Sequence, residues 1–71
     1  MRIKHFEATD TAIVELSKNP SVETWELNEN LYIDLDDQGF IVSITIEHAD
    51  KFAEMDELLY QHIPARSPMV K

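Results

Sequence analysis

Apolar and polar residues alternate along residues 31–47 of this chain. The apolar positions on one side of this pattern are Leu31, Ile33, Leu35, Phe40, Val42, Ile44 and Ile46. A period of two is typical of half-buried β-strands, so the stretch predicts two strands. Polar residues 36–39 separate them and end in the chain's only glycine, Gly39, which favours a four-residue hairpin loop. That loop pairs Leu35 with Phe40 and Ile33 with Val42, and it puts the apolar side chains on one face.

Three further strands are predicted before this hairpin. Residues 10–16 alternate, with Ala12 and Val14 on one side, and residues 22–27 place Trp25 on the apolar side. A three-residue loop after this segment pairs Trp25 with Ile33. Residues 2–6 are expected to form the first strand, and their pattern leaves open which of its faces is buried.

The period changes after residue 47, where apolar residues begin to recur at helical spacing. The stripe consists of Phe52, Met55, Leu58, Leu59, His62 and Ile63. Asp50 is suited to cap the start of this helix, and Pro64 ends it. We therefore predict an α+β fold, an antiparallel β-meander of four to five strands with one C-terminal helix packed on one face. Residues 1–63 are predicted to form this single domain, and residues 64–71 a flexible C-terminal tail.

Composition narrows the function classes. The 71 residues include no cysteine, and 14 acidic against 6 basic residues give a net charge of -8. This charge repels phosphates and excludes a nucleic-acid partner, whereas a basic protein is electrostatically complementary. No apolar run approaches the roughly 18 residues of a membrane span, and the start of the chain lacks the apolar run of a signal peptide. The sequence predicts a cytoplasmic protein with no membrane partner.

Candidate chemistry is sparse. Residues 34–41 resemble the opening of a calcium loop, but the twelfth position is Thr45, where such a loop needs a bidentate glutamate. A hairpin turn is the favoured interpretation. The spacing of His5, His48 and His62 fits no zinc pattern, and phosphate loops, dinucleotide-binding turns and serine-nucleophile motifs are absent. We predict no catalytic residue, no metal ligand and no cofactor. The alternative is a small hydrolase or metal-dependent enzyme that uses acidic residues.

One helix covers only one face of such a sheet. The other face combines a few apolar groups with polar ones, which is typical of either a solvated surface or a protein contact. The residues assigned to this possible interaction face are Ile13, Tyr32, Asp34, Ile41, Ser43 and Thr45. Because so small a core gains stability from a partner, the sequence favours a non-enzymatic protein-interaction domain, either a homodimer or a module that binds a basic protein.

The order of features along the chain forms a pattern. It begins with an aromatic–acidic pair, a spacer, an aspartate and an apolar strand, and it ends with a strand that follows a glycine. The segments are residues 6–16, 22–26, 31–36 and 39–46, followed by Ala49. Over about residues 2–52 the pattern resembles the small bacterial proteins grouped as domain of unknown function 2283. Phe6 and Glu7 depart from it, since tyrosine and aspartate are common there, and Ser43 stands where glycine is frequent. The resemblance implies a shared fold, a bacterial or phage source and an antitoxin-like or regulatory role, but no catalytic residue, because the family has no established activity.

Overall fold

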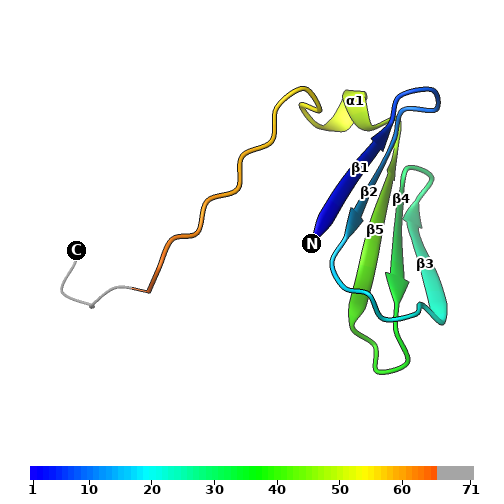
Figure 1. Ribbon diagram of the computed structural model, residues 1–71. Helices are drawn as coiled ribbons and strands as arrows, with labels where there is room; N and C mark the ends of the chain where they lie inside the picture. Colours follow the sequence, from blue (N-terminus) through cyan, green and yellow to red (C-terminus); the bar gives the residue numbers. More distant parts are fainter. Residues whose placement is uncertain (66–71) are drawn as a thin grey trace.

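The computed structural model describes residues 1–65. Its strands are β1 (Arg2–Phe6), β2 (Thr11–Glu15), β3 (Glu23–Asn28), β4 (Leu31–Leu35) and β5 (Ile41–Glu47), and a short helix, α1 (Ala49–Phe52), follows. All neighbouring strands are antiparallel, in the order β1-β2-β5-β4-β3 (Figure 1). The predicted α+β class, with a meander-like antiparallel sheet and a helix near the C-terminus, is confirmed.

Tight turns join β1 to β2, β3 to β4 and β4 to β5, and one longer connection, residues 16–22, links β2 to β3 at the far edge of the sheet. Backbone hydrogen bonds anchor both ends of that connection. The Leu16 N–H donates to the Val42 carbonyl at 2.7 Å, and the Val22 N–H donates to the Leu35 carbonyl at 2.8 Å. The connection thereby extends the ladder beyond the strands it joins.

The β4–β5 loop takes the shape that its glycine allows. Gly39 has a φ of 86°, in the left-handed region that glycine adopts at no steric cost. The buried carboxylate of Asp36 accepts hydrogen bonds from the N–H groups of Gln38 and Phe40, each at 2.9 Å, and from Nδ2 of Asn19 at 3.1 Å. These bonds, with that from Phe40 the strongest, hold the pKa of Asp36 below its usual value. The carboxylate that a calcium loop would offer to an ion therefore holds a hairpin turn together.

The register of this hairpin differs from the predicted one by two residues. Ile33 pairs with Ile44, and not with Val42, because the pairing shifts between Asp34 and Leu35. An irregularity of this kind accommodates extra residues on one strand. Since side chains alternate with a period of two, this shift leaves the side chains from Leu31 to Asp34 on their predicted faces, whereas Leu35 lies opposite Ile41 in place of Phe40.

The other pairings agree better with the pattern. Trp25 lies opposite Ile33, as predicted. On β1, Ile3 lies opposite Val14, so Ile3 shares the face of the other apolar residues. This resolves the question that the pattern of residues 2–6 left open.

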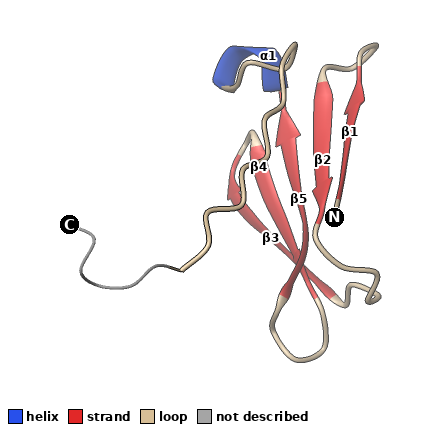
Figure 2. Cartoon of the chain, turned by 60° about the vertical axis from the view of Figure 1, so that its left-hand side comes forward, coloured by secondary structure: helices blue, strands red, loops and turns tan. Residues whose placement is uncertain are grey.

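The C-terminal helix is much shorter than predicted. It ends at Phe52, and Ala53 is extended, with φ -151° and ψ 155°. Residues 53–65, which we call the arm, contain no helix or strand and lead away from the sheet (Figures 1 and 2). The prediction of a helix through residue 63 that covers one sheet face was wrong. Of the predicted tail, residues 66–71 lie outside the described residues.

The arm has a physical reason not to be helical. A segment of about a dozen residues is a marginal helix in water unless its apolar stripe packs against something. In this structure Leu58, Leu59 and Ile63 are exposed, and so is Tyr60. Because these apolar side chains do not pack against the sheet, their helical spacing alone does not stabilise a helix.

The buried core of the described residues is small and lies at the two ends of the sheet. Ala12 and Ala49 are buried where α1 begins, and Leu35 and Val42 are buried beside the β4–β5 loop. Within residues 1–65 no large side chain is fully buried. None of the helical segments described here has the length and apolar character needed to cross a bilayer.

Candidate functional site

A row of apolar side chains crosses all five strands. Its members are successive cross-strand partners, so they lie on one face of the sheet. From β1 to β3 they are Ile3, Val14, Ile44, Ile33 and Trp25. A second, shorter row beside it consists of Ala12, Ile46 and Leu31. We call the surface formed by these two rows the apolar face.

The described residues leave most of the apolar face uncovered. Trp25 is 53% exposed and Ile3 37% exposed at the two edges, and the three residues between them are only half-buried. Helix α1 reaches one end of the face, where Phe52, Leu31 and Ile46 help to line an open hollow of about 310 Å³. We predicted that a helix covers these strands. In the described residues the sheet instead forms a single layer, and no second layer packs on its apolar face.

The opposite face, which we call the polar face, carries most of the residues that the sequence assigned to an interaction surface. One row contains Ile13, Thr45 and Tyr32, and the next contains Ser43 and Asp34. The structure brings these five residues together on β2, β5 and β4. Ile41 lies beyond the register shift, opposite Leu35. Contact through the polar face stays a prediction.

Polar side chains on the polar face are largely bonded to each other. Asp34 accepts hydrogen bonds from the hydroxyl of Ser43 at 2.7 Å and from that of Thr24 at 2.5 Å. Glu15 forms an ion pair with Lys4 at 2.9 Å, and this hydrogen bond is the main reason why the pKa of Glu15 is lowered. Asp34 and Glu15 therefore have partners within the sheet.

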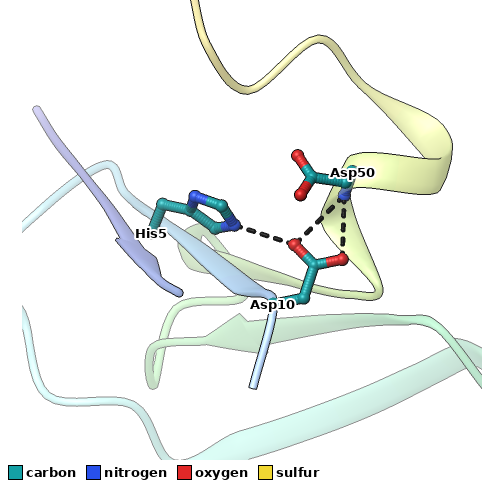
Figure 3. A group of neighbouring side chains, drawn as sticks. All are labelled: His5, Asp10 and Asp50. Atoms are coloured by element: carbon teal, nitrogen blue, oxygen red, sulfur yellow. Dashed lines mark hydrogen bonds and ion pairs between the residues drawn. The ribbon is translucent and has the colours of Figure 1, made fainter. Parts of the chain in front are cut away.

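A second cluster joins the β1–β2 turn to the start of α1 (Figure 3). Asp10 is in the left-handed region, with φ 54°, and its Oδ1 accepts a hydrogen bond from Nε2 of His5 at 2.8 Å. The N–H of Asp50 donates to both carboxylate oxygens of Asp10, at 3.2 and 3.1 Å, and the N–H of Ala49 donates to the Asp10 carbonyl at 2.9 Å. The bond from His5 is the main cause that lowers the pKa of Asp10. Asp10 therefore links the β1–β2 turn to the start of α1.

Asp10 takes the capping role that the sequence analysis gave to Asp50. The residue at the N-cap of α1, His48, is left-handed with φ 56° and makes no side-chain capping bond. Asp50 contributes a backbone N–H to the junction, while its carboxylate lies in the first turn of α1. Residues 10 and 50 are far apart in the sequence, and local patterns alone do not reveal that one caps the other. The available signal was the position of Asp10 in a turn, since aspartate is enriched among non-glycine residues with positive φ.

The junction also has the donor types of a metal site. Ligand atoms of His5, Asp10 and Asp50 lie within 4.8 Å of one another. Imidazole and carboxylate ligands suit several divalent metals. The 2.8 Å between Nε2 of His5 and Oδ1 of Asp10 is, however, a hydrogen-bond distance. Two ligands on one tetrahedral zinc ion lie about 3.3 Å apart, given metal–ligand distances of about 2.0–2.1 Å. In this arrangement the cluster acts as a structural clamp.

The fold and these sites define a class of small domain, a one-layer antiparallel sheet with a clamped helical turn at its end. The family described as "Protein of unknown function (DUF2283)" matches residues 2–49, and the chain belongs to this family. The resemblance seen in the sequence is thereby confirmed. The match includes all five strands and ends at the first residue of α1, so the arm lies outside it. No curated protein and no solved structure matched the chain.

Proposed function

We propose that this chain is a non-enzymatic protein-interaction domain that binds its partner through the apolar face. The observation that carries the proposal is the row from Ile3 to Trp25, which crosses every strand and is left uncovered by the described residues. A sheet with an apolar face becomes stable by burying that face against a second layer. Large exposed apolar patches on soluble proteins are typical of interaction sites. A protein partner would supply the missing layer.

The negative charge of the chain favours a partner whose surface is basic outside its contact with the apolar face. A net charge of -8 on 71 residues attracts basic proteins and accelerates their association at low ionic strength. The polar face adds acidic groups such as Asp34, Glu15 and Glu47 to this field. A regulatory or antitoxin-like domain that engages a basic protein is consistent with these features.

Two aromatic residues on adjacent strands allow a matched test of which face binds. Trp25 on β3 belongs to the apolar face, and Tyr32 on β4 belongs to the polar face. Each is replaced in turn by the photoreactive residue benzoylphenylalanine in the full chain, and cells that express the variant are irradiated. We expect protein adducts from position 25 and few from position 32, with the adducts identified by mass spectrometry. Equal adducts from both positions, or none from position 25, would contradict the proposal.

The junction of His5, Asp10 and Asp50 is the one observation that favours the alternative, a metal-dependent enzyme. Calorimetric titration of the full chain with Zn²⁺ and with Mn²⁺ tests it. Binding that His5→Ala abolishes and His48→Ala preserves would favour the enzyme, because both variants lose one imidazole and only His5 belongs to the cluster. Weak binding that is equal in both variants would leave the cluster as a clamp.

A further inference from the structure

We propose that the free edge of β3 receives an extended segment of a basic protein, as an added strand whose side chains alternate between basic and apolar. Within residues 1–65, β3 is an edge strand that pairs with β4 alone (Figure 1). Strand addition to such an edge supplies backbone hydrogen bonds, and the side chains of the added strand give the specificity. This contact goes beyond the proposed function, because it uses the backbone of one edge and not the apolar face.

Strand β3 is accessible to an added strand along its whole length. All six of its residues are exposed. Its sequence contains no lysine and no proline, which are residues that commonly protect an edge strand. The pairing of β3 with β4 is regular from Glu23 to Glu26, and the register shift comes only after Glu26. The edge is therefore regular where a strand would be added.

The charges around this edge favour a basic segment. Every charged residue in the stretch 19–47, which contains β3, β4 and β5, is acidic. The opposite edge strand, β1, instead carries Arg2 and Lys4. A basic strand is therefore attracted to β3 and repelled by β1.

The two faces of the sheet determine how the side chains of the added strand alternate. On the apolar face, the longer row ends at Trp25 on β3, which is 53% exposed. On the polar face, a row of cross-strand partners consists of Lys4, Ile13, Thr45, Tyr32 and Glu26. Successive residues of a strand point to opposite faces, so an added strand places one residue beside Trp25 and the next beside Glu26. An apolar side chain suits the first position, and a lysine or arginine suits the second.

The other edge of the sheet already contains this arrangement. On β1, Ile3 belongs to the apolar face and Lys4 to the polar face, so the strand alternates between apolar and basic residues. Arg2 and Lys4 form ion pairs with Glu15 on β2, at 3.2 and 2.9 Å. An added strand would repeat this arrangement beside β3, with Glu26 in the place of Glu15.

A synthetic peptide of about six residues that alternates lysine and valine is the probe, added to the isotope-labelled full chain. We expect amide hydrogen exchange, read by NMR, to slow at β3 and to stay unchanged at β1, because only the amides at the free edge of β3 gain partners. One control peptide has methylated backbone nitrogens, and a second has glutamate in place of lysine. We expect neither control to slow exchange at β3.

Glu26→Lys and Glu54→Lys are matched variants of the chain. Both glutamates are exposed and both changes alter the net charge equally, but only Glu26 lies on β3. Glu26→Lys replaces an attraction by a repulsion, so it is expected to weaken the affinity for the lysine–valine peptide about tenfold at low salt. Glu54→Lys is expected to change that affinity less than about twofold. Equal weakening in both variants would overturn the inference, since the peptide would then respond only to net charge.

The site of the slowed exchange separates this inference from the proposed function. Slowed exchange at β1, or at neither edge strand, would overturn the added strand and leave the cross-linking test of the apolar face unaffected. Binding that the methylated peptide retains, with spectral changes at Val14 and Ile44, would also overturn the added strand but would support the apolar face as the binding surface. Exchange at β3 that slows without peptide as the protein concentration rises would show that β1 of a second copy occupies the edge, which would overturn the choice of partner.

Discussion

Removing residues 57–65, the outer part of the arm, is expected to leave the stability of the domain unchanged. The comparison uses two shortened chains, residues 1–65 and residues 1–56, which differ only in residues 57–65. Both retain α1 and the half-buried Met55. In the structure Leu58, Leu59 and Ile63 are 72%, 75% and 76% exposed, so their removal forfeits little burial. We expect the two free energies of unfolding to agree within about 0.5 kcal/mol, the usual range for surface changes.

If the arm packed on the sheet, its removal would change the free energy of unfolding much more. Full burial of a large apolar side chain contributes about 1.5–3 kcal/mol, so a helix that packed Leu58, Leu59 and Ile63 on the sheet would contribute about 5–9 kcal/mol. A chain of 71 residues has a total stability of roughly 4–11 kcal/mol. The shorter chain would then lose most of its stability or fail to fold.

Urea denaturation distinguishes the two cases. Far-ultraviolet circular dichroism follows the sheet, and the emission of Trp25 follows the apolar face, at the same protein concentration for both chains and for the full chain. Midpoints and slopes that coincide between the two shortened chains support a detached arm. A free energy of unfolding for residues 1–56 that is several kcal/mol lower would refute the reasoning and show that the arm packs on the sheet.

Three further predictions concern the turns. Gly39→Ala is expected to lower the free energy of unfolding by about 1 kcal/mol and the Tm by about 4–8 °C. A new Cβ meets no atom within 4 Å, so only the left-handed φ is penalised. Thermal denaturation measures the change, with Gly39→Asn as the milder control. Asp10→Ala is expected to speed amide hydrogen exchange at Asp50, read by NMR, whereas Asp10→Asn, which keeps an acceptor, changes it less; equal exchange in both would show that the carboxylate does not cap α1. The pKa of Asp36 is lower in the folded state than the value of about 3.9 in an unfolded chain, so its contribution is complete above that value and is lost as the pH falls through the folded pKa. Stability should therefore decline below about pH 4, and Asp36→Asn should make that decline shallower in urea titrations at several pH values.

Period-two patterning predicted most of the sheet. Every strand, the chain's left-handed Gly39 and the pairing of Trp25 with Ile33 agree with the sequence. From Leu31 to Asp34 the register error between β4 and β5 amounts to two residues and leaves the side chains on their predicted faces, whereas beyond the shift Ile41 lies opposite Leu35. Face and register are separate pieces of information, and the hydrophobic pattern contains mainly the first. The register depends on the local irregularity beside Leu35, for which the pattern has no signal.

The arm and the junction could not be predicted in the same way. The stripe of Phe52, Leu59 and their neighbours shows what a helix would bury but not whether a surface is available to bury it. The capping bond from the Asp50 N–H to Asp10 joins the β1–β2 turn to the helix across 40 residues, so no local pattern records it. Both features depend on tertiary contacts and not on local preference.

The outer strands β1 and β3 have a consequence for handling the protein. Within residues 1–65 each pairs with a strand on one side only, and the backbone N–H and C=O groups of a free edge can template the addition of further chains. Arg2 and Lys4 on β1 and Glu23 and Glu26 on β3 make ribbon-like growth between identical strands electrostatically unfavourable. Growth of β1 onto β3 of the next molecule would pair opposite charges and never close, so concentrated, low-salt samples are where insoluble ribbons are expected to form first.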